Sequence, residues 1–365
     1  MSVREVTASQ SLVGSAPFSD TYRQLLNSLA PAGGHGRDSS NWVWGWPGRV
    51  IPRGPLSLAV LSALGGRSDT VGAVPPLEDV DPLSNDDFQL ALYLCYQLDF
   101  SRASSPDWPW DQELLNYRSA LEDAFVARLR GDVGTVKSKR TNDVVAGLHE
   151  LITTASGPSV PKYLCEKGSL DQLREYLVHR CVNELREVDP YVYESSSFAG
   201  SHPPVSTASA DGGSRSSDVT PRARTCFADT MAALNLDSTP GAYVVRLPAS
   251  TLATTNLGTM FAQHPQWRAA LAGLVAVLQM TSVASKEQFS LTLARFGIGA
   301  EGRRFFETSL DVAAHEALIE HLIRTEPCLR SDVLFGAACA LRLEKRFSRH
   351  VLGSWAKHRS SMLAR

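Results

Sequence analysis

Hydrophobic residues at helical spacing recur along most of the chain, and this pattern limits the possible folds more than any other feature. The clearest case runs from Ser169 to Asp189, where apolar residues share one helical face and Pro190 follows. The same spacing predicts further helices at about 85–100, 110–129 closed by Gly131, 141–154, 222–234, 251–263, 266–282, 286–296, 301–324 and from 328 to the end. Residues 242–247 suit one short extended piece, which is too little for a sheet. The sequence therefore predicts an all-α fold, built as a helical bundle.

The region before residue 81 differs from the rest in composition. It is rich in Gly, Pro and Ser, and Trp42, Trp44 and Trp46 alternate within it. We expect residues 1–80 to form an irregular N-terminal arm packed on a helical domain of residues 81–365, with the tryptophans packing on that domain or stacking on a ligand. Residues 194–221 are dominated by Ser, Thr, Gly and Pro, which predicts a loop or insertion.

Charge and hydropathy exclude several classes of protein. The chain has 365 residues, of which 43% are hydrophobic, and its formal net charge is −2, so it lacks the basic face that nucleic-acid binding needs. No apolar signal segment opens the sequence, and the longest apolar run, 269–278, is too short to cross a bilayer. The six cysteines form no C-x-x-C pair. We expect a cytoplasmic protein with no nucleic-acid and no membrane partner.

Several longer segments are shared with a known family. They include 174–180 followed by 185–190, and also 81–83, 226–231, 251–254 and 332–337. In these segments the chain resembles the actinobacterial iron-containing redox enzyme family, and the likeness extends over most of the sequence. The resemblance implies a heme-oxygenase-like helical bundle, which in that family usually holds two irons.

The same resemblance implies where metal ligands would stand, and most of those positions are substituted. Glu187 matches the first carboxylate ligand, and Gln279 replaces a glutamate. The next two ligand positions fall near Gly213 and Ala223. Of the last three ligands only His315 is matched, while the other two positions hold residues without a metal-binding side chain, Thr308 and Val312. Too few ligands remain for two irons.

Asp311 precedes His315 by four residues, so the two side chains share a helix face. One interpretation is a single iron held by Glu187, Asp311 and His315, as a variant of the facial triad. The other is a structural pair in which the carboxylate orients the imidazole. Glu175 and His179 have the same spacing, and they suit either metal ligation or an interior role behind the ligands.

These observations favour a small-molecule tailoring enzyme of bacterial specialised metabolism in which the diiron site is lost or altered. Its catalytic polar groups would be Glu187, Gln279, Asp311 and His315. Its substrate would be a small molecule, and its chemistry would need no cofactor. Two alternatives remain open. The first is a non-catalytic partner of a biosynthetic enzyme, and the second is an iron-dependent oxygenase with rearranged ligands. A homodimer or a biosynthetic partner protein fits any of these interpretations.

Overall fold

The computed structural model describes residues 50–64, 74–97, 112–134, 143–155, 157–186, 219–308 and 312–364, which belong to one compact unit. The regular structure of these residues is helical, with no strand among them, which confirms the predicted fold class. The helices are α2 (Pro55–Leu64), α3 (Asp86–Gln97), α4 (Gln112–Val133), α5 (Val144–Thr154), α6 (Val160–Lys167), α7 (Leu170–Glu184), α9 (Val219–Ala233), α10 (Ala249–Gln263), α11 (Arg268–Arg295), α12 (Ala300–Glu307), α13 (Val312–Thr325) and α14 (Arg330–Ala356). Trp42, Trp44 and Trp46 lie outside the described residues.

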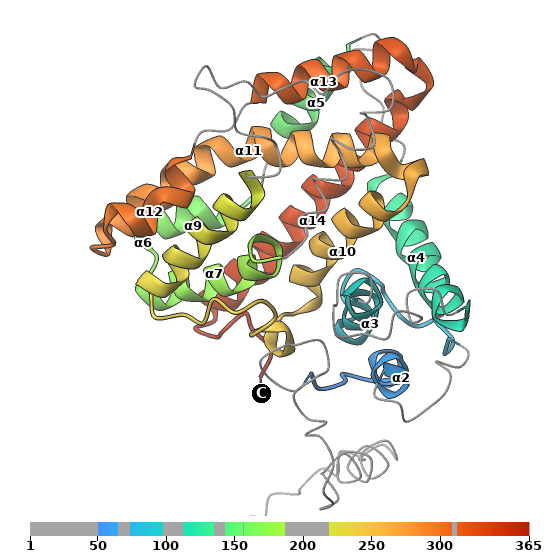
Figure 1. Cartoon of the computed structure of the whole chain (residues 1–365), viewed down its shortest axis with the longest axis horizontal. Coiled ribbons are helices and arrows are strands. Elements are labelled where there is room, and N and C mark those ends of the chain that lie inside the picture. The colour runs from blue at the N-terminus through green and yellow to red at the C-terminus, as the bar shows by residue number, and fades with distance from the viewer. Residues whose placement is uncertain are drawn as a thin grey trace, which may run out of the picture. The chain divides into compact units, whose positions relative to one another are not determined.

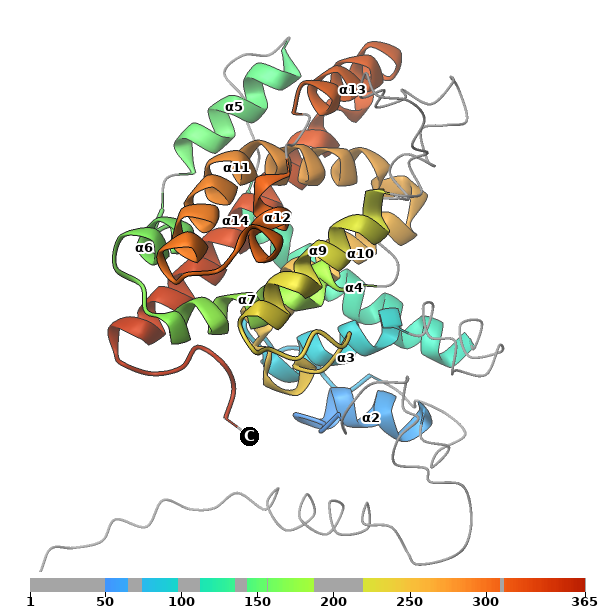
Figure 2. The ribbon, with the colours of Figure 1, turned by 60° about the vertical axis from the view of Figure 1, so that its left-hand side comes forward.

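The two longest helices, α11 and α14, cross at the centre of this unit (Figures 1 and 2). Every residue from 269 to 277 is buried, because other helices surround the first half of α11. Two glycines allow the close crossing. A Cβ on Gly273 would lie 1.9 Å from the carbonyl oxygen of Val333, and one on Gly336 would lie 1.9 Å from that of Ala270. The two backbones therefore touch where side chains would normally separate them.

One described segment, Pro265–Arg295, is long and apolar enough to cross a bilayer by length and composition alone. Half of its most apolar window is buried inside the protein, against neighbouring helices such as α14. Burial of this kind is what the core helix of a helical bundle shows, so the finding is weak support for a membrane span.

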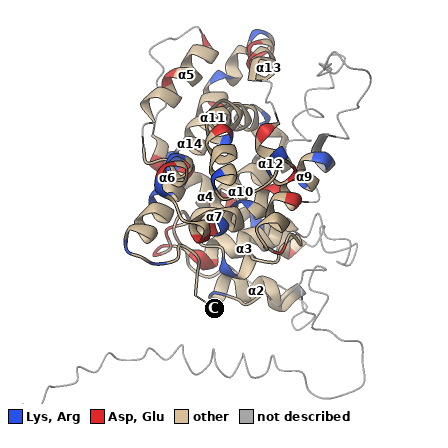
Figure 3. Ribbon diagram, turned by 90° about the vertical axis from the view of Figure 1, so that its left-hand side faces the viewer, with Lys and Arg blue, Asp and Glu red and all other residues tan. Residues whose placement is uncertain are grey.

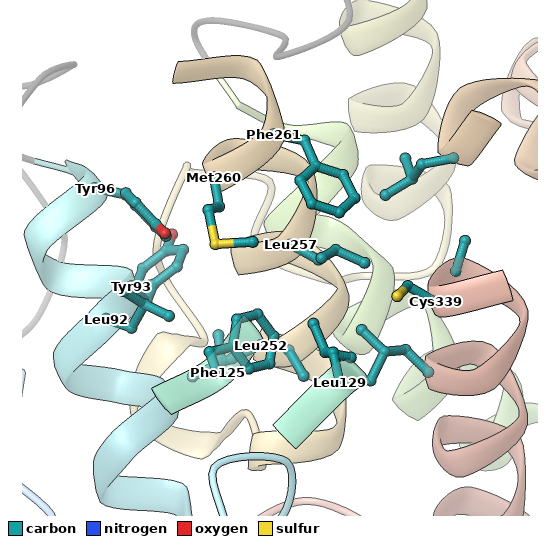
Figure 4. Packing of buried hydrophobic residues seen from close by; sticks show 14 of the residues in the cluster. Leu92, Tyr93, Tyr96, Phe125, Leu129, Leu252, Leu257, Met260, Phe261 and Cys339 are labelled. Atoms are coloured by element: carbon teal, nitrogen blue, oxygen red, sulfur yellow. The ribbon is translucent and has the colours of Figure 1, made fainter. Parts of the chain in front are cut away.

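The main hydrophobic core joins α3, α4, α10, α11 and α14 (Figure 4). Its largest fully buried side chains include Tyr96 and Phe88 from α3, Phe125 from α4 and Phe261 from α10. A second core cluster joins α7, α9, α11, α12 and α14, and it includes Tyr176, Phe227, Phe289 and Phe347. This second cluster lies beneath the candidate site described below.

Two acids at the start of α3 fix the starts of two other helices. The carboxylate of the buried Asp87 accepts hydrogen bonds from the backbone N–H groups of Leu56 and Ser57, each at 2.8 Å, and so caps α2. Asp86 accepts a hydrogen bond from the N–H of Ala249 at 2.6 Å, at the start of α10. Helix α2 lies in the region that was expected to be irregular, and its cap comes from a distant part of the chain, where local sequence gives no signal for it.

The C-terminal tail is fastened to α7 through Glu175. Its carboxylate accepts hydrogen bonds from the indole of Trp355 at 2.8 Å, the hydroxyl of Ser360 at 2.7 Å and the backbone N–H of Ser361 at 2.7 Å. The Ser361 hydroxyl also donates to it. Burial opposes ionisation of this carboxyl, but the hydrogen bonds outweigh it and hold the pKa of Glu175 below its usual value.

Several predicted helix boundaries are wrong. Helix α4 runs past Gly131 to Val133, and Gly134, with a φ of 67°, stands in the left-handed region where a helix can stop. The segments predicted at 266–282 and 286–296 form one unbroken helix, α11, because residues 283–285 contain no helix breaker.

Two further predictions differ from the structure. The predicted helix at 301–324 is two helices, α12 and α13, and Thr308 is extended at the end of the first. Residues 244–246 form a turn of 3₁₀ helix instead of the extended piece expected at 242–247. Arg53 donates to the carbonyl oxygen of Val244 at 2.8 Å, which ties this turn to the segment before α2.

Candidate functional site

Helix α7 is the described helix that precedes Glu187 in the sequence. The helix starts at a capping box made by Ser169 and Gln172, and it ends at Glu184, short of the predicted end at Asp189. There the guanidinium of Arg186 donates to the hydroxyl of Thr259 on α10, at 3.0 Å. This contact ties the C-terminal end of α7 to α10. Glu187 itself lies outside the described residues, so its role stays a prediction.

Gln279 lies near the middle of α11, where it is partly exposed. Lys286 follows it by seven residues, two helical turns later, and therefore occupies the same face of the helix. Gln279 supplies a neutral amide and Lys286 an amine. This face of α11 thus presents no carboxylate at the position where the resemblance would require one.

The amine of Lys286 is held between a backbone carbonyl and an aromatic ring. Its Nζ donates to the carbonyl oxygen of Thr308 at 3.3 Å and lies 5.2 Å from the ring centre of Phe305. Burial disfavours the charged form and lowers the pKa of Lys286, although the negative charge of Glu184 acts in the opposite direction. Thr308 is one of the positions that the resemblance assigns to a metal-binding histidine.

Glu184 on α7, whose charge acts on this amine, belongs to a chain of ion pairs between α7 and α14. Arg180 pairs with Glu184 at 3.1 Å and approaches Glu344 at 4.0 Å. Burial raises the pKa of Glu344, which Arg180 and a hydrogen bond with Ser348 only partly offset. We call Arg180, Glu184, Lys286 and Glu344 the charged cluster. Elsewhere, acidic and basic residues are interspersed over the helices in view (Figure 3).

Aromatic side chains of the second core cluster lie next to the charged cluster. Tyr176 stacks on Phe289 with ring centres 4.7 Å apart, and Phe289 contacts Phe306 at 5.1 Å. Phe305 meets Phe306 edge to face at 5.0 Å, and it meets Phe227 in the same way at 5.0 Å. The charged cluster is therefore next to an apolar surface, and charges there interact more strongly than they would in water.

Of the four predicted site residues, the structure describes Gln279 and His315. His315 is partly exposed in the first turn of α13, and α13 contacts the helix that carries Gln279. Asp311, like Glu187, lies outside the described residues. The grouping of Glu187, Gln279, Asp311 and His315 therefore stays a prediction, as does a single iron held by three of them.

His179 has an interior structural role. Its side chain is 1% exposed, and its two ring nitrogens face the hydroxyls of Thr251 at 2.6 Å and Ser361 at 2.8 Å. Burial lowers its pKa to about 3, against the attraction of Glu175, so the ring is neutral near pH 7. Nδ1 thus joins α7 to α10, and Nε2 joins α7 to the C-terminal tail.

The described residues do not fit a pair of irons. Among them, no group of three or more His, Cys, Asp or Glu side chains is arranged to hold a metal ion. The ammonium of Lys286 lies against Thr308, and a cation there repels a bound dication. An amide, an amine and two carboxylates can instead orient a substrate and transfer protons.

Sequence reasoning overlooked most of the charged cluster. The spacing of Gln279 and Lys286 on one helical face was a usable signal for the lysine. Arg180 and Glu344 gave no comparable signal, because they are far apart in sequence and meet only when α7 packs on α14.

Comparison with known families matches residues 224–345 to the family described as iron-containing redox enzyme. The matched segment contains Gln279, Lys286, Thr308, His315 and Glu344. This match confirms the predicted relationship to the heme-oxygenase-like superfamily. No curated protein matches the chain significantly.

Proposed function

We propose that this chain, which carries a domain of the iron-containing redox enzyme family, is a divergent member that modifies a small molecule in bacterial specialised metabolism without a diiron centre. It would act in the cytoplasm, alone or with a partner protein. The observation that carries the proposal is the contact between the ammonium of Lys286 and the carbonyl oxygen of Thr308, at 3.3 Å. Thr308 is a position at which the family resemblance implies a metal ligand.

The electrostatics of this contact support the proposal. A pair of irons needs anionic ligands that neutralise its charge. Here Gln279 offers only a neutral amide, and Lys286 contributes a positive charge. The helical scaffold of the family is thus combined with side chains suited to bind and orient an organic substrate.

The pKa shifts in the charged cluster suit acid–base chemistry. Burial lowers the pKa of Lys286 and raises the pKa of Glu344, so both pKa values shift in the direction of neutral pH. An amine and a carboxyl of this kind are groups that can donate a proton to a substrate or accept one from it. In the proposed enzyme, Gln279 and His315 orient the substrate, and the charged cluster donates protons to it or accepts protons from it.

Two alanine variants test the proposal. Gln279→Ala and His315→Ala should each abolish the change in metabolites that the wild-type protein causes in an expressing bacterium, as measured by mass spectrometry. Both variants should keep the wild-type melting temperature, because both side chains are partly exposed. His321→Ala, at an exposed position on the same helix as His315, is the control and should behave like wild type.

Retention of the metabolite change in both variants would refute the assignment of these residues. A wild-type protein that changes no metabolite but co-purifies with a biosynthetic enzyme would replace the proposal with the non-catalytic partner.

A further inference from the structure

Lys286 is a partly buried cation without an ion-pair partner in the described part of the chain. Its Nζ donates to the carbonyl oxygen of Thr308 and lies over the ring of Phe305. Glu184 attracts it over a longer distance, but the carboxylate of Glu184 is paired with Arg180 at 3.1 Å. Within the described residues, the positive charge of Lys286 is therefore not neutralised by a direct neighbour.

Other lysines of the described chain show that this arrangement is not the default. Lys162 lies 3.9 Å from Glu166, and its side chain is 66% exposed. Lys167 lies over the ring of Tyr163 at 5.1 Å, as Lys286 does over Phe305, but Lys167 is exposed to water. Among the lysines that the structure describes, Lys286 alone combines the ring contact with a pKa lowered by burial. An unpaired, partly desolvated ammonium lowers stability, and an anion from outside the chain would offset that cost.

The surroundings select the kind of anion. A phosphate dianion is usually bound by several N–H donors or by a bidentate arginine. Here one ammonium is available, and the guanidinium of Arg180 is already engaged by Glu184. The negative charge of Glu184, which acts on Lys286, also disfavours a dianion. A single carboxylate matches the single free donor group.

The neighbouring ring indicates what the carboxylate is attached to. Phe305 is partly exposed, and it packs edge to face on Phe306 and Phe227. An apolar group beside the carboxylate would bury part of this ring. A ligand with one negative end and an apolar body satisfies both features of the site.

We propose that Lys286 is the counter-ion for the carboxylate of a small organic acid, whose apolar part packs on Phe305. The inference rests on the proposed function, because it names the class of substrate for that same site. It assigns to Lys286 a role in binding that neither the fold nor the family match specifies.

Calorimetric titration of the full-length, chelator-treated protein with trans-cinnamate tests this inference. Cinnamate should bind, and Lys286→Met should weaken its binding by about tenfold to a hundredfold, the usual effect of losing one charge-assisted hydrogen bond. Lys286→Arg should retain most of the affinity because it keeps the charge. Lys167→Met is the matched control, since it removes a lysine that also lies over an aromatic ring, and it should leave binding unchanged.

Two further probes separate the contribution of the carboxylate to binding from that of the apolar body. Cinnamyl alcohol, which has the same apolar body without the charge, should bind much more weakly than cinnamate, and inorganic phosphate should not compete. The inference is overturned if cinnamate does not bind, if Lys286→Met binds it normally while keeping the wild-type melting temperature, or if the alcohol or phosphate binds equally well. Because no turnover is measured, cinnamate binding that depends on Lys286 would stand even if the Gln279→Ala and His315→Ala variants refuted the proposed catalysis.

Discussion

Gly273→Ala should lower the free energy of unfolding by about 3 kcal/mol or more. The added Cβ would lie 1.9 Å from the carbonyl oxygen of Val333. This obstacle is backbone, so α11 and α14 would have to move apart along their crossing. Urea denaturation followed by circular dichroism measures the change.

Gly353→Ala provides the control for this prediction. Gly353 lies on α14 as well, but nothing lies within 4 Å of the position of its Cβ. The substitution should therefore stabilise the protein by up to about 1 kcal/mol, because alanine favours a helix more than glycine does. Equal effects at positions 273 and 353 would show that the two helices do not cross as closely as described.

Glu175→Ala should cost about 3 kcal/mol of stability, because it removes the acceptor for the indole of Trp355 and for both the N–H and the hydroxyl of Ser361. The tail beyond α14 should then become accessible to proteases. Glu166→Ala, which breaks an exposed pair with Lys162, should change stability by less than about 0.5 kcal/mol. Limited proteolysis and urea denaturation of both variants distinguish these outcomes.

The contribution of Glu175 should also depend on pH in a defined direction. Its folded-state pKa is below the ordinary value of 4.5, so its stabilisation is complete above about pH 4.5 and is lost as the pH falls through the folded-state pKa. The stability difference between wild type and Glu175→Gln should therefore shrink below pH 4.5. A difference that grows as the solution is acidified would contradict this assignment.

The helical pattern was sufficient to predict the fold class, because amphipathic spacing of the kind seen in 169–184 depends only on local sequence. Features that depend on distant partners were not predictable. The cap that Asp87 supplies to α2 joins residues 31 positions apart, and Glu175 binds Ser361 at a separation of 186. The break between α12 and α13 was also not predictable, because the residues between the two helices include no proline or glycine.

The candidate site was predictable only in part, for a related reason. Gln279 was identified by resemblance to a family, and nothing in its local spacing would have singled it out, whereas His315 also lies four residues after Asp311. Lys286 shares a helical face with Gln279, but its importance depends on the carbonyl of Thr308, which comes near only after the chain turns between α11 and α12. Charge pairing across helices, as between Arg180 and Glu344, requires the packed structure.

Our central proposal is that this chain, whose residues 224–345 match the iron-containing redox enzyme family, works without a diiron centre. The most direct test is elemental analysis of the full-length protein purified with added ferrous iron, together with the shift of its melting temperature on iron addition. We predict no stoichiometric iron and no thermal shift, because Gln279 and Lys286 stand on the helix face that would have to supply a carboxylate ligand. Two irons per chain with a raised melting temperature would contradict the account and indicate an iron-dependent oxygenase.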